Sequence, residues 1–148
     1  MSQWEAFLDT TPPPKPTGFF RRLAAITYDL FLLTAVLFFY SAIWVGVNQG
    51  EAVTHPFFHL SLLLIISAFF VFFWTRKGQT LGMQSWRIRV IDRDGHIPNG
   101  KTAVLRLLYA GLSWAPCGLG YLWALIDKDK QTWHDKLSKT YLVYLPKN

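Results

Sequence analysis

Asp29 is the residue of this sequence with the clearest capacity for chemistry, because its carboxyl group stands inside a long apolar stretch. Arg22 precedes it by seven positions, or two helical turns, so both side chains would project from nearly the same face of a helix. A charged group inside a bilayer costs several kcal/mol unless it is paired, hydrated or protonated, and therefore marks a functional site by default. Two interpretations stay open: a proton or cation site, and a structural ion pair that fixes helix packing.

Histidines are the other candidates, as metal ligands or as acid–base groups. His134 and Asp135 are adjacent, so their side chains point apart on a regular element, and no second histidine stands at ligand spacing. His55 and His59 would share one helix face, but on the opposite side of the membrane, with Glu51 as the neighbouring carboxylate. The sequence assembles no Ser/His/Asp or Cys/His nucleophile. We therefore expect no metal site, no cofactor and no enzymatic activity.

The elements that must position Asp29 are apolar enough to be membrane helices. Of the 148 residues, 51% are hydrophobic and 16% are charged, whereas soluble domains carry about a quarter charged residues. Residues 30–47 and 57–74 contain no Asp, Glu, Lys or Arg. At about 1.5 Å per residue, each stretch can cross a hydrocarbon core of roughly 30 Å. The single cysteine, Cys117, leaves no internal disulfide and no cysteine-cluster metal site.

We expect a mainly α-helical membrane protein with two full transmembrane helices, over residues 19–47 and 57–75. The connecting loop, residues 48–56, contains no Lys or Arg. Residues 1–17 are polar and proline-rich, unlike a cleaved signal peptide, and are expected to form a flexible cytoplasmic tail. Residues 18–145 are then the membrane domain.

A third apolar region, residues 102–127, is broken by Pro116, Gly118 and Gly120. A straight helix would lose a hydrogen bond and clash at Pro116. A full third crossing would put the five lysines that follow it outside, against the positive-inside tendency. A turn at residues 115–120 would keep every Lys and Arg cytoplasmic. We favour a re-entrant or interfacial helical hairpin, with a kinked third span as the alternative, and both termini on the cytoplasmic side of a bacterial inner membrane.

A small cytoplasmic β element is expected between residues 86–92 and 140–145. In the first segment apolar and basic residues alternate, with Trp86, Ile88 and Val90 on one face. The second is rich in β-branched and aromatic residues. Pairing of the two would bring the His134–Asp135 turn back to the cytoplasmic end of the first helix.

Three motifs, in this order, resemble the RDD family of small bacterial membrane proteins, which is named for an arginine and two aspartates. They are Arg22-x6-Asp29, TRKGQTLG at residues 75–82 and WHDKLSKT at residues 133–140, and the resemblance covers residues 18–144. On this resemblance Arg22 and Asp29 match the arginine and the first aspartate. Asp135 is our choice for the second aspartate, with Asp127 as a weaker candidate. The resemblance implies transport of an unidentified ligand, and exchange of sodium or other cations for protons is proposed for some members.

Two functions stay open. The first is transport of ions or a small solute through a charge network of Arg22, Asp29 and Asp135, which requires a homo-oligomer because two spans cannot enclose a pathway. The second is a non-catalytic accessory or scaffold protein that binds lipid or a membrane partner protein. The formal net charge is +6, and the basic residues flank membrane segments. Anionic lipid headgroups are therefore the expected partners, and nucleic acid is not.

Overall fold

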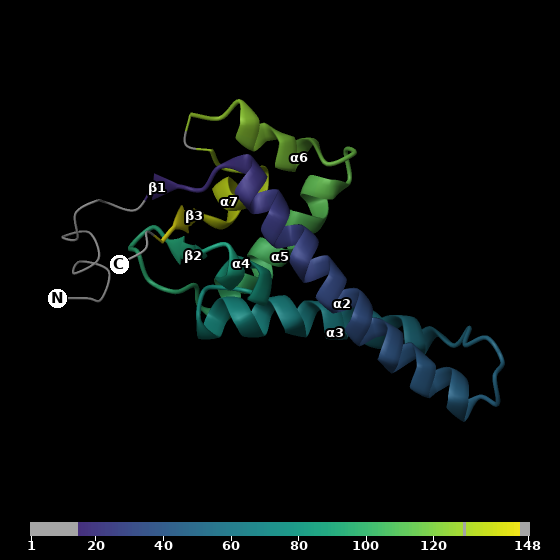
Figure 1. Ribbon diagram of the computed structural model, residues 1–148. Coiled ribbons are helices and arrows are strands. Elements are labelled where there is room, and N and C mark those ends of the chain that lie inside the picture. The colour runs from purple at the N-terminus through teal and green to yellow at the C-terminus, as the bar shows by residue number, and fades with distance from the viewer. Residues whose placement is uncertain (1–14, 129, 146–148) are drawn as a thin grey trace.

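Two long helices dominate the computed structural model, which describes residues 15–128 and 130–145 (Figure 1). Helix α2 is Phe19–Val47 and helix α3 is Pro56–Arg76, the bounds expected from the apolar runs to within one residue. Both are long and apolar enough to cross a membrane, and 6% of the apolar window of each is buried inside the protein. These helices therefore present apolar side chains outward along most of their length, as a lipid environment requires.

Local sequence sets the helix ends at the loop between α2 and α3. The side-chain amide of Asn48 donates to the carbonyl oxygen of Trp44 at the end of α2 (3.2 Å). Pro56 takes the first position of α3, where the missing N–H would have no helical partner in any case. His55 caps this end, because its Nδ1 accepts from the Phe57 N–H (3.2 Å). His55 thus has a structural role in the helix cap.

The remaining elements gather at the opposite end of the helix pair, around the start of α2 and the end of α3 (Figure 1). In chain order they are β1 (Lys15–Pro16), α4 (Leu81–Ser85), β2 (Ile88–Asp92), α5 (Gly100–Trp114), α6 (Leu119–Leu122), the 3-10 helix η1 (Trp123–Leu125), α7 (Trp133–Ser138) and β3 (Thr140–Tyr144). A small core joins them to the long helices, formed by Ala25, Trp74, Met83, Ile88, Val90, Ala103 and Leu142.

The sheet contains the expected pairing and one strand more. Strands β2 and β3 pair antiparallel, with Ile88 opposite Tyr144, and Ile88 and Val90 are fully buried. Trp86 differs from the expectation: it is 41% exposed and follows α4 instead of entering the strand. Order in the sheet is β1-β3-β2.

Strand β1 comes from the end of the segment that was expected to be a flexible tail. Lys15 and Pro16 pair with β3, and the Thr17 N–H donates to the Leu142 carbonyl oxygen (3.0 Å). Proline is tolerated there because β1 is an edge strand. Residues 1–14 of the expected tail lie outside the described residues.

The third apolar region folds as a hairpin of helices. Helix α5 ends at Trp114, and the backbone turns through Cys117 (φ 55°) and Gly118 (φ 79°) before α6 begins. Helix α6 then packs back on α5, since a Cβ added to Gly120 would lie 2.6 Å from the Cβ of Ser113. The break therefore lies where Pro116 and the two glycines predicted it.

Candidate functional site

Asp135 is the centre of a buried charge cluster. It lies in the first turn of α7, where a capping box holds it: the Thr132 hydroxyl accepts from the Asp135 N–H (3.4 Å), and Asp135 Oδ2 accepts from the Thr132 N–H (3.2 Å). Arg22, from the start of α2, donates to Asp135 Oδ2 through Nη1 (2.7 Å) and to the Lys130 carbonyl oxygen through Nη2 (3.1 Å). The cluster thereby joins the first membrane helix to α7.

A second arginine, Arg106 of α5, faces the other oxygen of Asp135. Its Nη1 donates to Asp135 Oδ1 and also to the hydroxyl of Thr140 (2.7 Å). Asp135 is fully buried, and Arg22 and Arg106 are 4% and 2% exposed. Burial alone would raise the pKa of the Asp135 carboxyl, but the two guanidinium groups outweigh it and hold that pKa well below its usual range. Asp135 is therefore ionised.

His134, the neighbour of Asp135, is neutral at pH 7. Its Nε2 lies 3.0 Å from the Thr132 hydroxyl and its Nδ1 3.4 Å from the Ser113 hydroxyl. Burial lowers the pKa of His134 to about 3; Asp135 acts in the opposite direction, and Arg106 and Arg22 add to the lowering. The distance of 3.7 Å between His134 Nε2 and Asp135 Oδ1 is too long for a hydrogen bond. The two residues therefore do not form a hydrogen-bonded acid–base pair.

Asp29 is bound to a different element from Arg22 and Asp135. Its Oδ2 accepts from the Thr80 hydroxyl, and its Oδ1 accepts from the Gly82 N–H (2.8 Å). Helix α4 begins directly after Thr80, and Asp29 is 4% exposed. The structure thus brings Arg22 and Asp135 together, while Asp29 fastens α4 to α2.

Asp127, the weaker candidate for the second aspartate, lies between η1 and α7. Its Oδ2 accepts from the Gln131 N–H (3.0 Å), and its Oδ1 forms an ion pair with Lys136 Nζ. Asp127 therefore stabilises the turn that leads into α7.

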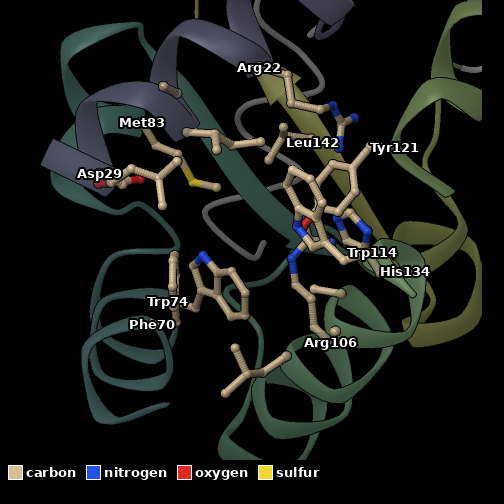
Figure 2. A pocket seen from close by; sticks show the side chains of 16 residues that line it. Arg22, Asp29, Phe70, Trp74, Met83, Arg106, Trp114, Tyr121, His134 and Leu142 are labelled. Carbon is tan, nitrogen blue, oxygen red and sulfur yellow. The ribbon is translucent and has the colours of Figure 1, made fainter. Parts of the chain in front are cut away.

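A cavity of about 310 Å³ separates the Asp135 cluster from Asp29. Figure 2 shows Arg22, Arg106 and His134 on one side of it and Asp29 on the other. Between them the lining is mostly apolar and includes side chains from the long helices and α5, namely Ile26, Phe70, Trp74 and Leu107. The cavity can therefore hold a small ligand with a charged group at one side.

Comparison with known proteins decides the family. The sequence profile of the RDD family matches residues 16–139. The chain belongs to the RDD family.

Two curated proteins are similar to this chain, and both are described as uncharacterized. YckC from Bacillus subtilis is 30% identical over 135 residues, which cover 88% of this chain and 85% of that protein. RP437 from Rickettsia prowazekii is 25% identical over 81 residues, which cover 55% of this chain and 45% of that protein, so the match spans less than half of RP437. No solved structure matches the chain with significance.

Three residues that complete the RDD charge clusters were not singled out from the sequence. Arg106 was not among the candidate residues predicted from the sequence. Thr80 and Gly82 lie in the TRKGQTLG motif that pointed to the family, yet the motif gave no sign that they face Asp29. Only glycine fits at position 82, because an added Cβ would lie 2.2 Å from the Ala25 carbonyl oxygen.

One group of side chains outside the clusters has the spacing of metal ligands. Asp92, Asp94 and His96 place ligand atoms within 4.8 Å of one another. Asp92 Oδ1, however, already accepts from the backbone N–H groups of Asp94 (3.0 Å) and His96 (2.8 Å). This arrangement is that of an aspartate closing the turn after β2.

Proposed function

We propose that this RDD protein is a two-span inner-membrane protein with its sheet and α4–α7 on the cytoplasmic side. What supports the orientation is charge: every Lys and Arg among the described residues lies at the sheet end of the helix pair, and the loop joining α2 to α3 has none. Cytoplasmic segments carry the excess of basic residues in membrane proteins.

The α5–α6 hairpin, on this proposal, lies in the cytoplasmic boundary of the bilayer. Helix α5 has 15 residues, or about 22 Å of helix, which is too short to cross a core of roughly 30 Å. The hairpin nevertheless exposes large apolar side chains, with Leu108 60%, Leu112 61% and Leu119 52% exposed. Apolar side chains at that depth would be covered by lipid.

The function that this geometry supports best is that of a non-catalytic accessory protein, which binds lipid or a membrane partner at the cytoplasmic boundary. The observation that carries this proposal is that the buried charges of both clusters are engaged within the chain. Both oxygens of Asp29 accept hydrogen bonds from the α4 segment, and Asp135 faces two arginines. These charges hold cytoplasmic segments onto membrane helices.

Transport of ions or a small solute is the second candidate, and one observation favours it. Asp29 lines the same cavity as Arg22 and Arg106. A solute in that cavity could therefore contact both a carboxylate and guanidinium groups. A carrier would need Asp29 to leave Thr80 and Gly82 during each cycle, and it would need an oligomer to enclose a pathway.

A flux assay in proteoliposomes separates the two candidates. The accessory proposal predicts that sodium and proton fluxes equal those of empty vesicles, for the wild type and for Asp29→Asn alike. Asp94→Asn, at an exposed carboxylate in the turn after β2, is the matched control. A wild-type flux that Asp29→Asn abolishes and Asp94→Asn leaves intact would replace the accessory proposal with transport.

A further inference from the structure

The cavity beside the Asp135 cluster changes from charged to apolar along both of its main walls. On α2 the wall carries Arg22 and then Ile26 and Leu30, one and two turns farther along the helix. Asp29 also lies on this wall, but Thr80 and Gly82 bind its carboxylate. On α5 Arg106 is followed by the apolar lining residues Leu107, Ala110 and Gly111. Leu30 is 54% exposed, so the apolar part of the cavity opens there on the outer surface of the protein, where lipid would lie.

The charged part of the cavity carries an excess positive charge. Arg22 and Arg106 share one carboxylate, Asp135, and His134 is neutral because burial lowers its pKa to about 3. Asp29 also lines the cavity, but its carboxylate is bound to Thr80 and Gly82 on the opposite side (Figure 2). Two cations therefore face the polar end with one anion between them.

Buried donors at the same place have no acceptor. The Nε atoms of Arg22 and Arg106 and the Nε1 atom of Trp74 are buried without a hydrogen-bond partner among the described residues. All three residues line the cavity, and the guanidinium carbon of Arg106 lies 5.1 Å from the centre of the Trp74 ring. Buried polar groups are nearly always satisfied, so unpartnered donors beside a net positive charge indicate a missing anionic acceptor.

We propose that this cavity binds a single-chain anionic amphiphile, with its carboxylate or phosphate head beside Arg22 and Arg106 and its alkyl chain between α2 and α5. The orientation is that of a lipid in the cytoplasmic leaflet, because Arg22 lies at the boundary and Leu30 about 12 Å deeper along α2. The volume of about 310 Å³ is at the low end of small-molecule sites, which suits one chain. This inference rests on the proposed membrane placement.

Binding can be measured by native mass spectrometry of the full chain in a neutral detergent. The probes are dodecanoate and dodecyl phosphate, which distinguish the two heads, and dodecanol, which has the chain without the charge. We expect one charged probe per chain, bound at least about tenfold more tightly than dodecanol, which is about 1.4 kcal/mol. Binding of either charged probe supports the proposal, and equal binding of dodecanol overturns it.

Two glycine substitutions locate the site. A Cβ added to Gly111 or to Gly46 meets nothing within 4 Å, but Gly111 lines the cavity and Gly46 lies near the far end of α2. Gly111→Leu should abolish binding of the charged probes, and Gly46→Leu should not change it. Should Gly111→Leu fail to fold, Leu30→Trp makes the same test from the exposed rim.

The outcomes separate this inference from the proposed function. Unchanged binding to Gly111→Leu, or loss of binding in both glycine variants alike, would overturn the cavity as the site. Cysteine labelling could show that the sheet is cytoplasmic while none of the charged probes binds. That combination would overturn the inference and leave the proposed membrane placement unchanged. A sheet labelled from outside would contradict the proposed function whatever the probes do.

Discussion

At the scale of single residues, the Arg22–Asp135 pair ties α2 to α7. Because Arg22 is 4% exposed and Asp135 is fully buried, removing Arg22 leaves the buried Asp135 carboxylate with one of its two guanidinium partners. We expect Arg22→Gln to lower the free energy of unfolding by about 3–5 kcal/mol, the usual cost of breaking a buried ion pair. Thermal or denaturant unfolding in detergent measures this change.

Arg93→Gln is the control for the Arg22 variant, since Arg93 is an exposed arginine in the turn after β2. It should change stability by less than about 0.5 kcal/mol. Combining Arg22→Gln with Asp135→Asn should recover part of the loss, which is the coupling that a double-mutant cycle measures. Recovery is partial because Arg106 then loses its carboxylate. Wild-type stability of Arg22→Gln would contradict the assigned role of the pair.

The pH dependence of stability should reflect His134. Its pKa is about 3 in the folded protein and about 6.5 when unfolded, so between these values the unfolded chain binds more protons. Stability is therefore fully present above pH 6.5 and falls as the pH drops towards 3, by up to about 1.4 kcal/mol per unit. The depressed pKa of Asp135 adds a loss in the same direction below its ordinary value.

His134→Gln tests this assignment, because it removes the titrating group while keeping polar atoms near Ser113 and Thr132. In the variant, the free energy of unfolding measured from pH 7 to pH 4.5 should become nearly independent of pH. If this free energy falls with pH as steeply as in the wild type, a group other than His134 causes the pH dependence.

Sequence reasoning finds the charged residues of a membrane helix, because polar groups are rare in apolar runs. It suggests Asp135 as a partner of Arg22, but it does not find the other partners. Arg106 meets Asp135 only because α5 packs on α7. Thr80 and Gly82 meet Asp29 through a short helix that no periodic pattern predicts. Contacts between residues far apart in the chain depend on packing that a single sequence does not display.

At the scale of elements, the contact between α4 and α2 depends on a glycine. A Cβ on Gly82 would lie 2.2 Å from the Ala25 carbonyl oxygen and 2.9 Å from Asp29 Cγ. Gly82→Ala should therefore push α4 away from α2 and destabilise the protein by about 1–3 kcal/mol, as overpacking does. Thermal unfolding in detergent is the measurement.

Gly46→Ala is the matched control, because an added Cβ there meets nothing within 4 Å. Alanine also has the higher helix propensity, so this variant should be as stable as the wild type or slightly more stable. Equal thermal stability of Gly82→Ala and Gly46→Ala would contradict the close approach of α4 to α2.

Some elements were predictable and others were not. The bounds of α2 and α3 follow from long uncharged runs, and the break after α5 follows from proline and glycine. Strand β1 was missed because Lys15–Pro16 has neither alternation nor β-branched residues, and its pairing with β3 is set by the neighbouring sheet. Trp86 was misplaced because the alternating pattern begins before the chain leaves α4.

At the scale of the whole molecule, the charged clusters, the sheet and the hairpin all lie at one end of two apolar helices (Figure 1). The central claim is that this end is cytoplasmic and that the hairpin does not cross the bilayer. On this proposal the basic surface would face the anionic headgroups of the cytoplasmic leaflet.

Cysteine labelling in intact cells tests this claim most directly. Cys117 is exposed and would first be replaced, with glycine because its φ is 55°. Single cysteines would then replace Glu51, Asp94 or Asn148. With a membrane-impermeant reagent, we expect labelling at position 51 in intact cells, and labelling at positions 94 and 148 only after permeabilisation. Labelling at position 148 in intact cells would establish a third crossing and contradict the account.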